Sequence, residues 1–435
     1  MSYADPFEAL QNEMRRSDLV CSFEFRAATP LLIGGYDTFI SHGDLGREGL
    51  RPLSIKGVWR WWARALVSAA IRRRFGKFPS LEGADRVVAK VLGTTRGRAS
   101  SSKYQIVVTE LGVRTVPLRE YGEVARLKLL ELGGRRGGIS RDIVLGRDSR
   151  FRVDLYRQAN TSPSEDAFAV ASLLLALTFG GVGKATSRGF GKLAPIQLSC
   201  DLAGVRGIFN DLKRLGDGGR VLSGTRLQSN LVIEIVKRSM NSCVGLAAPL
   251  VENMEGAARY EYPLIETPEE GYYRVLVANR LFNGDLDALQ AIGRATLKLY
   301  WKALDFVRKG DPPRTAVRRA WSLTGEAYHT WILGLPRGQE PEEGQRTGYW
   351  AEMGRRDPKG IRRKSPVIFV PVGIPIGTRY YVIVLGFKTF DWSKAVISRW
   401  GPRGREAVST APSSVDAAFD QAMDYIRGVL ETAWG

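Results

Sequence analysis

Residues 54–75 read SIKGVWRWWARALVSAAIRRRF, and this stretch decides how the first half of the chain folds. Lys56, Arg60 and Arg64 are spaced i, i+4, i+8, so they share one side of a helix that begins at Ser54. The pattern therefore predicts a helix with one face in the core and an opposite face that is cationic. The predicted core face consists of Val58, Trp62, Ala65, Leu66 and Ala69.

The segments around this helix alternate between strand and helix patterns. A second helix is indicated by an acidic start at Pro163 followed by a long apolar run. The resulting order is strand, helix, strand, strand, helix, strand, which is typical of a ferredoxin-like, RNA-recognition-type domain with insertions. The predicted strands are residues 21–27, 104–109, 151–156 and 193–199.

The second half of the sequence indicates the same class less clearly. We place a domain boundary in the glycine-rich stretch 202–224, giving domains 1–202 and 203–435. The fold class is therefore α+β, with two ferredoxin-like (RRM-like, βαββαβ) domains. In the second half we predict strands at 230–237 and 272–278, helices at 286–307 and 315–333, a hairpin from 366–373 and 380–387, and a final helix at 414–432.

The net charge sets the strongest limit on function. The 435 residues include 64 Lys+Arg against 45 Asp+Glu, a formal charge of +19. This excess favours a polyanionic partner, above all a nucleic acid, because neutralised phosphates release counterions. A ribosome-like or membrane-surface role is the alternative, and a GC-rich or thermophilic genome could contribute part of the arginine content.

Several classes of protein are disfavoured. No uninterrupted apolar stretch approaches the ~20 residues that span a bilayer, and the N-terminus lacks the apolar core of a signal peptide, so we expect a cytoplasmic protein. Cys21, Cys200 and Cys243 are odd in number and far apart, so they fit neither a disulfide framework nor a zinc site. We expect no cofactor and no metal.

The first candidate site surrounds the first helix. Residues 47–77 contain nine Lys and Arg against the single acid Glu48, and the helix N-terminus adds its dipole. Such a surface would bind a phosphate backbone without base contacts, whereas Trp61 and Trp62 are expected in the core. The candidate RNA-binding residues here are Arg47, Arg51, Lys56, Arg60 and Arg64.

Two further segments could contact RNA. The stretch 181–191 has the spacing G-x-G-x5-G-x-G, which lets backbone amides and cations approach phosphates closely. Its candidates are Gly181, Gly183, Lys184, Arg188, Gly189 and Gly191. The basic segment 355–366 is either a mobile loop or a second RNA contact. Its candidates are Arg355, Arg356, Arg362, Arg363 and Lys364.

Catalytic groups are scarce. His42 and His329 are the only histidines and lie in different predicted domains, so no acid–base pair for RNA cleavage is evident, and no carboxylate cluster suggests a two-metal nuclease. We therefore expect no catalytic residue. The alternative is a metal-independent endoribonuclease with His42 as general base, because His42 lies beside Asp37 and Asp44 near the basic helix.

Four motifs together carry a resemblance to a known family: TPLLIGGYD, LRPLSIKGVWRWWARAL, GGVGKATSRGFGKL and, late in the chain, RRKSPVIF. The chain resembles the RAMP superfamily of CRISPR proteins, and within it the first subunit of the Cmr module of type III-B effector complexes. The resemblance covers about 200 N-terminal residues well and the C-terminal half through one motif.

The resemblance implies two ferredoxin-like domains and no catalysis by this subunit. It also implies a place near the 3′ end of the CRISPR RNA, with guide RNA, single-stranded target RNA and other Cmr subunits as partners in antiviral defence. Carried over by motif, the RNA-facing residues are Arg51, Lys56, Arg60, Arg64, Lys184 and Arg188.

Overall fold

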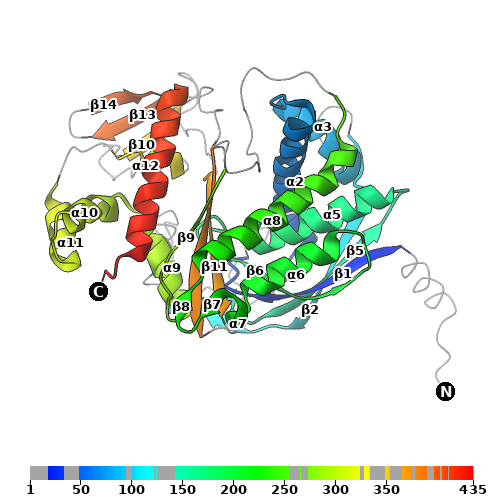
Figure 1. Cartoon of the computed structure of the whole chain (residues 1–435), viewed down its shortest axis with the longest axis horizontal. Coiled ribbons are helices and arrows are strands. Elements are labelled where there is room, and N and C mark those ends of the chain that lie inside the picture. Colours follow the sequence, from blue (N-terminus) through cyan, green and yellow to red (C-terminus); the bar gives the residue numbers. More distant parts are fainter. Residues whose placement is uncertain are drawn as a thin grey trace.

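The structure is a computed structural model, and it combines antiparallel sheets with helices, so the predicted α+β class is confirmed (Figure 1). The residues that it describes are 18–33, 49–94, 99–121, 124, 143–253, 265, 273–323, 328–333, 348–352, 365–374, 378–388, 396–401, 404–409 and 411–434.

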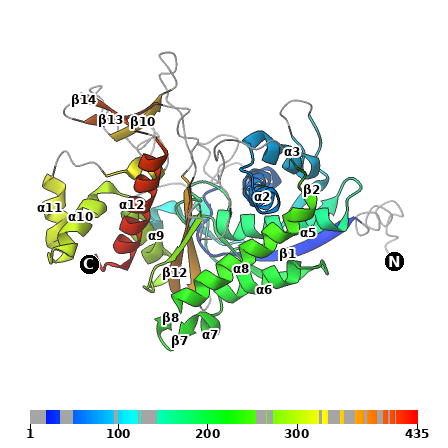
Figure 2. The same cartoon turned by 45° about the horizontal axis from the view of Figure 1, so that its top comes forward.

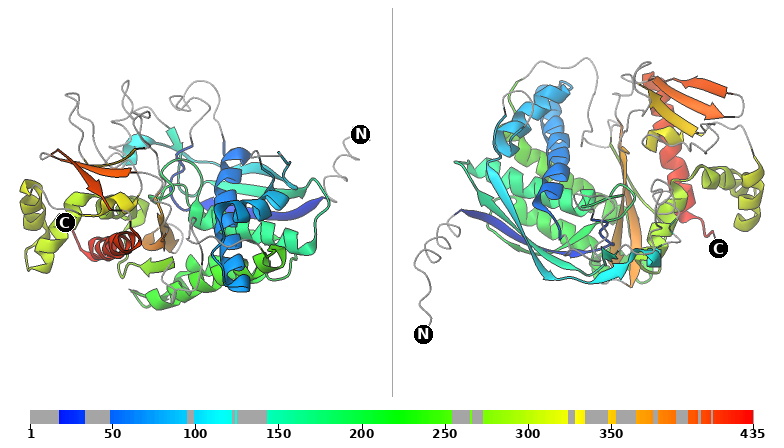
Figure 3. Two further views of the ribbon diagram at one scale, coloured as in Figure 1. Left: turned by 90° about the horizontal axis from the view of Figure 1, so that it is seen from above. Right: turned by 180° about the vertical axis from the view of Figure 1, so that it is seen from behind.

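A four-stranded antiparallel sheet forms the base of the N-terminal half. Its strand order is β2-β5-β1-β6, and the chain order is β1, α2, β2, β5, α5, β6. Figure 3 shows α2 and α5 on one side of this sheet. The four strands and two helices predicted here are present, with β1 at Leu19–Ala27, α2 at Pro52–Phe75, β2 at Tyr104–Gly112, β5 at Arg150–Arg157, α5 at Pro163–Leu175 and β6 at Leu193–Ser199.

Helix α2 begins at Pro52, two residues before the expected start, because proline's fixed φ and missing N–H suit the first helical position. It ends at Gly76, whose φ of 66° is a left-handed cap. Its core face is anchored by Trp59, whose Nε1 donates a 2.8 Å hydrogen bond to Ser172 Oγ of α5. The two helices are thereby fixed to each other above the sheet.

The C-terminal half contains a three-stranded sheet in the order β11-β12-β9. This order matches β2-β5-β1, and the described residues contain no further strand beside β9. The predicted strand at 272–278, the hairpin and the final helix are confirmed. The elements are β9 at Tyr273–Val277, α9 at Gly284–Ala295, β11 at Val367–Ile374, β12 at Arg379–Phe387 and α12 at Pro412–Glu431.

Both faces of this second sheet are buried. Tyr381, Ile383 and Leu385 of β12 join the core of the N-terminal half, whereas Val382 and Val384 face the core formed with α9 and α12. Strands covered on both faces read as unbroken apolar runs, which explains the sequence of β11 and β12. The second sheet therefore lies between two hydrophobic clusters, one that it shares with the N-terminal half and one that it forms with α9 and α12.

Helices α6 (Val205–Leu215) and α8 (Ser229–Ala247) follow the N-terminal sheet and pack on α5, and α8 also contacts α2 and β9 (Figure 2). The predicted strand at 230–237 is wrong. Its β-branched residues imitated a strand, but the buried side chains Val232, Ile235 and Val236 follow a helical spacing.

Other boundaries differ from the prediction. The expected helix 286–307 is α9 followed by α10 (Lys298–Arg308), and the expected helix 315–333 is α11 (Pro313–Ser322) followed by the turn η6 (Thr330–Leu333). Several mostly short helices, turns and strands were not predicted from the sequence. They are α3 (Leu81–Leu92), α7 (Gly218–Val221), η1 (Leu118–Tyr121), η4 (Ala248–Leu250), β3 (Thr115–Pro117), β4 (Ile143–Leu145), β7 (Leu222–Ser223), β8 (Arg226–Leu227), β10 (Gly348–Glu352), β13 (Val396–Gly401) and β14 (Gly404–Val408).

The cysteine prediction is also corrected. Cys21 and Cys200 form a disulfide with a Cα–Cα distance of 4.9 Å, although 179 residues separate them. They meet because β1 and β6 are neighbours in the sheet, with Ser22 opposite Ser199. Cys243 is a buried free thiol. Among the described residues, no helix combines the length and apolar character needed to cross a membrane.

Candidate nucleic-acid interface

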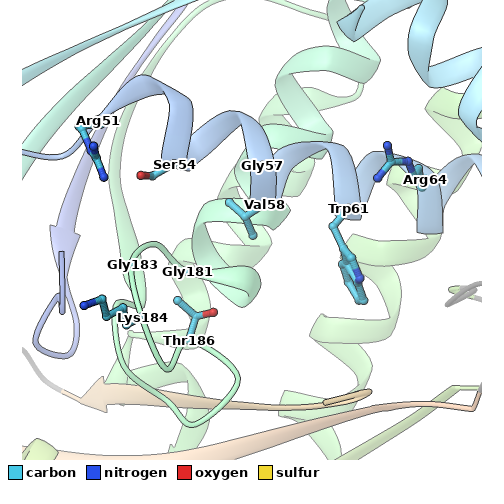
Figure 4. A pocket seen from close by; sticks show the side chains of 10 residues that line it. All are labelled: Arg51, Ser54, Gly57, Val58, Trp61, Arg64, Gly181, Gly183, Lys184 and Thr186. Atoms are coloured by element: carbon cyan, nitrogen blue, oxygen red, sulfur yellow. The ribbon is translucent and has the colours of Figure 1, made fainter. Parts of the chain in front are cut away.

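A cavity of about 590 Å³ lies between the N-terminal part of α2 and the glycine-rich loop that follows α5 (Figure 4). Five residues predicted from sequence line it: Arg51, Arg64, Gly181, Gly183 and Lys184. The remaining lining residues are Ser54, Gly57, Val58, Trp61 and Thr186. The structure thus brings together a cationic helix and side-chain-poor backbone that are more than 110 residues apart in sequence.

The conformation of the loop requires glycine at two of its predicted positions. Gly183 has a φ of 91°, and a Cβ there would lie 2.7 Å from the carbonyl oxygen of Leu32. Gly191 has a φ of 66°, and a Cβ there would lie 1.9 Å from the carbonyl oxygen of Val182. Both contacts are with rigid backbone, so any side chain would force the loop away from its support.

Two buried polar residues, Thr29 and Lys192, hold the glycine-rich loop in place. Neither was predicted from the sequence as a functional residue. Thr29 Oγ1 donates to the Gly189 carbonyl at 2.7 Å. Lys192 is 1% exposed, and its Nζ donates to the carbonyls of Phe179 and Gly180 at 2.6 and 3.0 Å. These carbonyls end the π-helical turn η3 (Ala176–Gly180), where a cation compensates the negative end of the helix dipole. In the sequence, the only indication of this supporting role is that Lys192 stands among apolar neighbours.

The N-terminus of α2 provides a positive end to the cavity. Arg51 occupies the N-cap, its side chain makes no cap hydrogen bond, and the first turn contains no acidic residue. The first turn itself therefore carries no acidic side chain that would offset the helix dipole, which favours anions. On the loop, Lys184 is exposed and lies across the cavity from Arg51 and Ser54 (Figure 4).

The predicted cationic face of α2 is divided by helix α3. Arg60 donates a 2.6 Å hydrogen bond to the carbonyl of Leu92, and Arg64 forms an ion pair with Asp85. Neither Lys56 nor Arg60 lines the cavity, whereas Arg64 does. Arg60 and Arg64 therefore contact the α3 side of the helix, and their contact with RNA stays a prediction.

The cations on α2 repel one another. Burial lowers the pKa of Lys56, and the neighbouring charge of Arg60 lowers it further. Burial also lowers the pKa of Arg60, followed by repulsion from Arg64, and Asp85 offsets only part of this. An anion bound nearby would relieve this repulsion.

Arg188 and Gly189 contact the C-terminal half of the chain and do not line the cavity. Arg188 donates a 2.7 Å hydrogen bond to the carbonyl of Leu333. A Cβ on Gly189 would lie within about 3 Å of Ile292 and Pro371. The Arg188 guanidinium therefore joins the loop to the second half of the chain, and its contact with RNA stays a prediction.

The two tryptophans have different surroundings. Trp62 is fully buried, as predicted. Trp61 is half-buried and lines the cavity, and its ring centroid lies 5.3 Å from that of Phe387 in β12. The prediction of a core position is thus correct for Trp62 only, and Trp61 gives the cavity an aromatic wall.

Some predicted residues cannot be placed, because they lie outside the described residues: His42, Arg47, Arg355, Arg356, Arg362, Arg363 and Lys364. His329 is half-buried, its Nδ1 accepts a 3.2 Å hydrogen bond from Trp331 Nε1, and burial lowers its pKa. Within the part of the chain that the structure describes, no group of three or more His, Cys, Asp or Glu could hold a metal ion.

The N-terminal part of the chain matches a known protein superfamily. Residues 24–194, which contain α2, the N-terminal sheet and the glycine-rich loop, match the family model of the RAMP superfamily. This part of the chain is therefore similar to the RAMP superfamily, which confirms the resemblance seen in its motifs.

Within that class, the chain is similar to proteins named Cmr1. It is 24% identical to the CRISPR system CMR subunit Cmr1 of Saccharolobus solfataricus, over 45% of this chain and 59% of that protein. It is 32% identical to the CRISPR system Cmr subunit Cmr1-1 of Pyrococcus furiosus, over 40% of this chain and 50% of that protein. The matches span between half and three fifths of these curated relatives.

The fold is also that of a solved structure. A chain of the type III-B Cmr-beta complex, determined by cryo-electron microscopy with cognate target RNA bound, matches with a TM-score of 0.52 and 14% identity. The match covers 94% of this chain and 100% of that chain. At this identity the similarity establishes the shared fold.

Proposed function

We propose that this chain is a non-catalytic RNA-binding subunit of a type III-B CRISPR ribonucleoprotein complex, and that the cavity between α2 and the glycine-rich loop holds the ribose-phosphate backbone of single-stranded RNA. The observation that carries this proposal is the common lining of one cavity by Arg51, Lys184 and the backbone of Gly181 and Gly183.

The chemistry of the lining suits a phosphate. Arg51 and Lys184 supply positive charge on two sides, and Ser54 and Thr186 bring hydroxyl groups. The N-terminus of α2, whose first turn contains no acidic residue, adds its dipole. None of these groups distinguishes one base from another, so the site would grip the backbone. Sequence selection would then come from base pairing between guide and target within the complex.

The similarity to Cmr1 proteins supports the choice of RNA and of partners. We propose contact with guide or target RNA near the 3′ end of the CRISPR RNA, assembly with other Cmr subunits, and a role in antiviral defence in the cytoplasm. We also propose that residues 1–202 and 203–435 are two ferredoxin-like domains. The common strand order of β2-β5-β1 and β11-β12-β9 supports this.

The residues that line the cavity favour RNA binding over RNA cleavage. The ten lining residues include neither an imidazole nor a carboxylate, the groups that most often serve as general base. The rival is an endoribonuclease that uses His42. Labelled CRISPR-repeat RNA incubated with the chain in the absence of metal should stay intact, and cleavage abolished by His42→Ala would contradict the proposal.

Charge removal at the cavity tests the binding site. We expect the double variant Arg51→Ala/Lys184→Ala to bind fluorescein-labelled single-stranded RNA about tenfold more weakly at low salt. The slope of log affinity against log salt should flatten by ~0.7 for each lost phosphate contact.

The matched control is Arg220→Ala/Arg226→Ala, because these cations are exposed on α7 and β8, away from the cavity, and carry the same charge. Fluorescence anisotropy at several salt concentrations measures both quantities, and melting curves confirm that each variant folds. Equal losses in the two double variants would show that the effect is only one of net charge and would overturn the proposed site.

A further inference from the structure

Trp321 is an unusually exposed aromatic residue at the end of α11. It is 77% exposed, whereas Ala316 and Ala320 of the same helix are buried. The buried face of α11 packs on α10. Helix spacing therefore places Trp321 on the side of α11 that faces away from the protein.

Two arginines share this outward face. Arg314 and Arg318 precede Trp321 by seven and three residues, which places all three side chains on one stripe of the helix. Both are exposed, and no ion pair joins either of them to a described residue. Arg319 is different, because it pairs with Asp311 at 2.7 Å and lies over the ring of Phe306.

We propose that this α11 stripe, consisting of Arg314, Arg318 and Trp321, is a second contact for single-stranded RNA. The Trp321 indole would stack on a base, and the two guanidinium groups would bind the neighbouring phosphates. Seven residues of helix span about 10 Å, so the cations lie alongside the stacked base and extend along the strand.

The surroundings of Trp321 favour RNA over a protein partner. A protein-binding tryptophan normally lies within a contiguous apolar patch. The other large apolar side chains that are exposed in the described part of the chain are Leu19, Leu53, Val107 and Leu111, and they lie on β1, α2 and β2. Trp321 is instead flanked by guanidinium groups, as in surfaces that bind single strands.

The α11 stripe is separate from the cavity. Figure 1 shows α11 at one end of the molecule and α2 in the other half, and the views in Figures 2 and 3 agree. The inference therefore does not rest on the proposed function of the cavity. Each surface can be tested while the other is intact.

The test compares variants of the full chain in anisotropy titrations with fluorescein-labelled oligouridine. We expect Trp321→Ala to weaken binding about five- to tenfold, because loss of one stacking partner has an effect of this size, and Trp321→Phe to retain most of the affinity. Arg314→Gln/Arg318→Gln should weaken binding and flatten the salt dependence, whereas Arg220→Gln/Arg226→Gln, with the same charge change, should not do so to the same extent.

Three results would overturn the inference: wild-type affinity in Trp321→Ala, no RNA binding by the unchanged chain, or equal effects of the two arginine pairs. Retained RNA affinity together with lost binding to a protein subunit would assign the stripe to a protein partner. An unaffected Arg51→Ala/Lys184→Ala variant beside a weakened Trp321→Ala variant would overturn the proposed cavity site and leave the α11 stripe standing.

Discussion

At the scale of single residues, the cavity depends as much on missing side chains as on charged ones. Gly57 is exposed on α2, lines the cavity, and has no atom within 4 Å of the position of an added Cβ. A larger side chain at this position would therefore fill the cavity without removing any positive charge. This makes Gly57 the residue that best separates a shaped site from a diffuse cationic surface.

We predict that Gly57→Leu weakens single-stranded RNA binding at least fivefold with an unchanged net charge, because it occludes the site. Gly57→Ala should instead raise the free energy of unfolding by about 0.5–1 kcal/mol, as expected for glycine replacement in a helix. The matched control is Gly245→Leu on α8, which is also exposed, helical and free of contacts. RNA titrations and urea unfolding measure the two effects, and equal RNA affinity in both leucine variants would contradict the prediction.

The residue types of the site were predictable from sequence, but their individual roles were not. Arginines at helical spacing predicted α2 as a cationic helix, and the spacing of the glycines predicted a loop that could approach phosphates. The division between Arg51, which lines the cavity, and Arg60, which binds the Leu92 carbonyl, depends on α3. Since α3 was not predicted, the sequence could not show which cations it covers.

At the scale of secondary structure, helix α5 begins with a capping box that is linked to β2. Glu165 accepts from the Ser162 backbone at 2.9 Å and from Lys103 Nζ at 2.6 Å, just before Tyr104 begins β2. Burial on its own would raise the pKa of Glu165, but these hydrogen bonds outweigh it and leave the pKa below the ordinary value of 4.5. The ionised form of Glu165 therefore stabilises the fold.

We predict that Glu165→Gln lowers the free energy of unfolding by about 0.5–1 kcal/mol at neutral pH. A lowered carboxyl pKa gives stability that is complete above 4.5 and is lost as the pH falls through the folded-state value. The difference between wild type and variant should therefore shrink as the pH falls below 4.5. Urea unfolding over a series of decreasing pH values measures it, and a difference that does not change with pH would count against this role.

The support of the glycine-rich loop gives a second prediction at this scale. Lys192→Met keeps the apolar stem but leaves the carbonyls of Phe179 and Gly180 without their donor. We expect a loss of about 2–3 kcal/mol in the free energy of unfolding, because unpaired buried acceptors are costly. RNA affinity should fall as well, since the loop follows this turn directly. Wild-type stability and affinity in Lys192→Met would contradict this account of the loop.

Elements with a clear period or a strong start signal were predictable, and ambiguous apolar runs were not. Residues Pro163–Leu175 begin with a capping box and form a helix as expected. Residues 230–237 are rich in β-branched side chains, and their helical conformation is set by packing on α5 and β9, which local sequence does not reveal. The sequence predicts β11 and β12 only as a hairpin. A short apolar run does not show which other elements will cover each face of the sheet that it joins.

At the scale of the whole molecule, both halves contribute to one large hydrophobic cluster, whose buried residues run from Val20 in β1 to Phe387 in β12. A second cluster, formed with α9 and α12, covers the other face of the second sheet. Polar contacts also join the halves: Asp285 accepts from Arg147 at 3.0 Å, and Tyr380 donates to the Ala28 carbonyl at 2.8 Å. Local sequence patterns do not predict that the two halves are joined in this way, because the contacts form between segments that are distant in sequence.

We therefore predict that residues 18–434 unfold in one cooperative step. Differential scanning calorimetry should show a single transition, because both halves contribute buried side chains to the same hydrophobic cluster. Neither half can unfold without exposing side chains of the other half to water. Asp285→Asn should shift this transition to lower temperature without splitting it. Two resolved transitions in the unchanged chain would show that the halves are energetically independent.

Ultraviolet crosslinking of the assembled ribonucleoprotein tests whether the cavity between α2 and the glycine-rich loop holds an RNA backbone. We predict that crosslinked peptides mapped by mass spectrometry include residues 181–188 and the start of α2, and that Gly57→Leu reduces these crosslinks selectively. Crosslinks confined to other surfaces, with 181–188 unmodified in the intact complex, would contradict it.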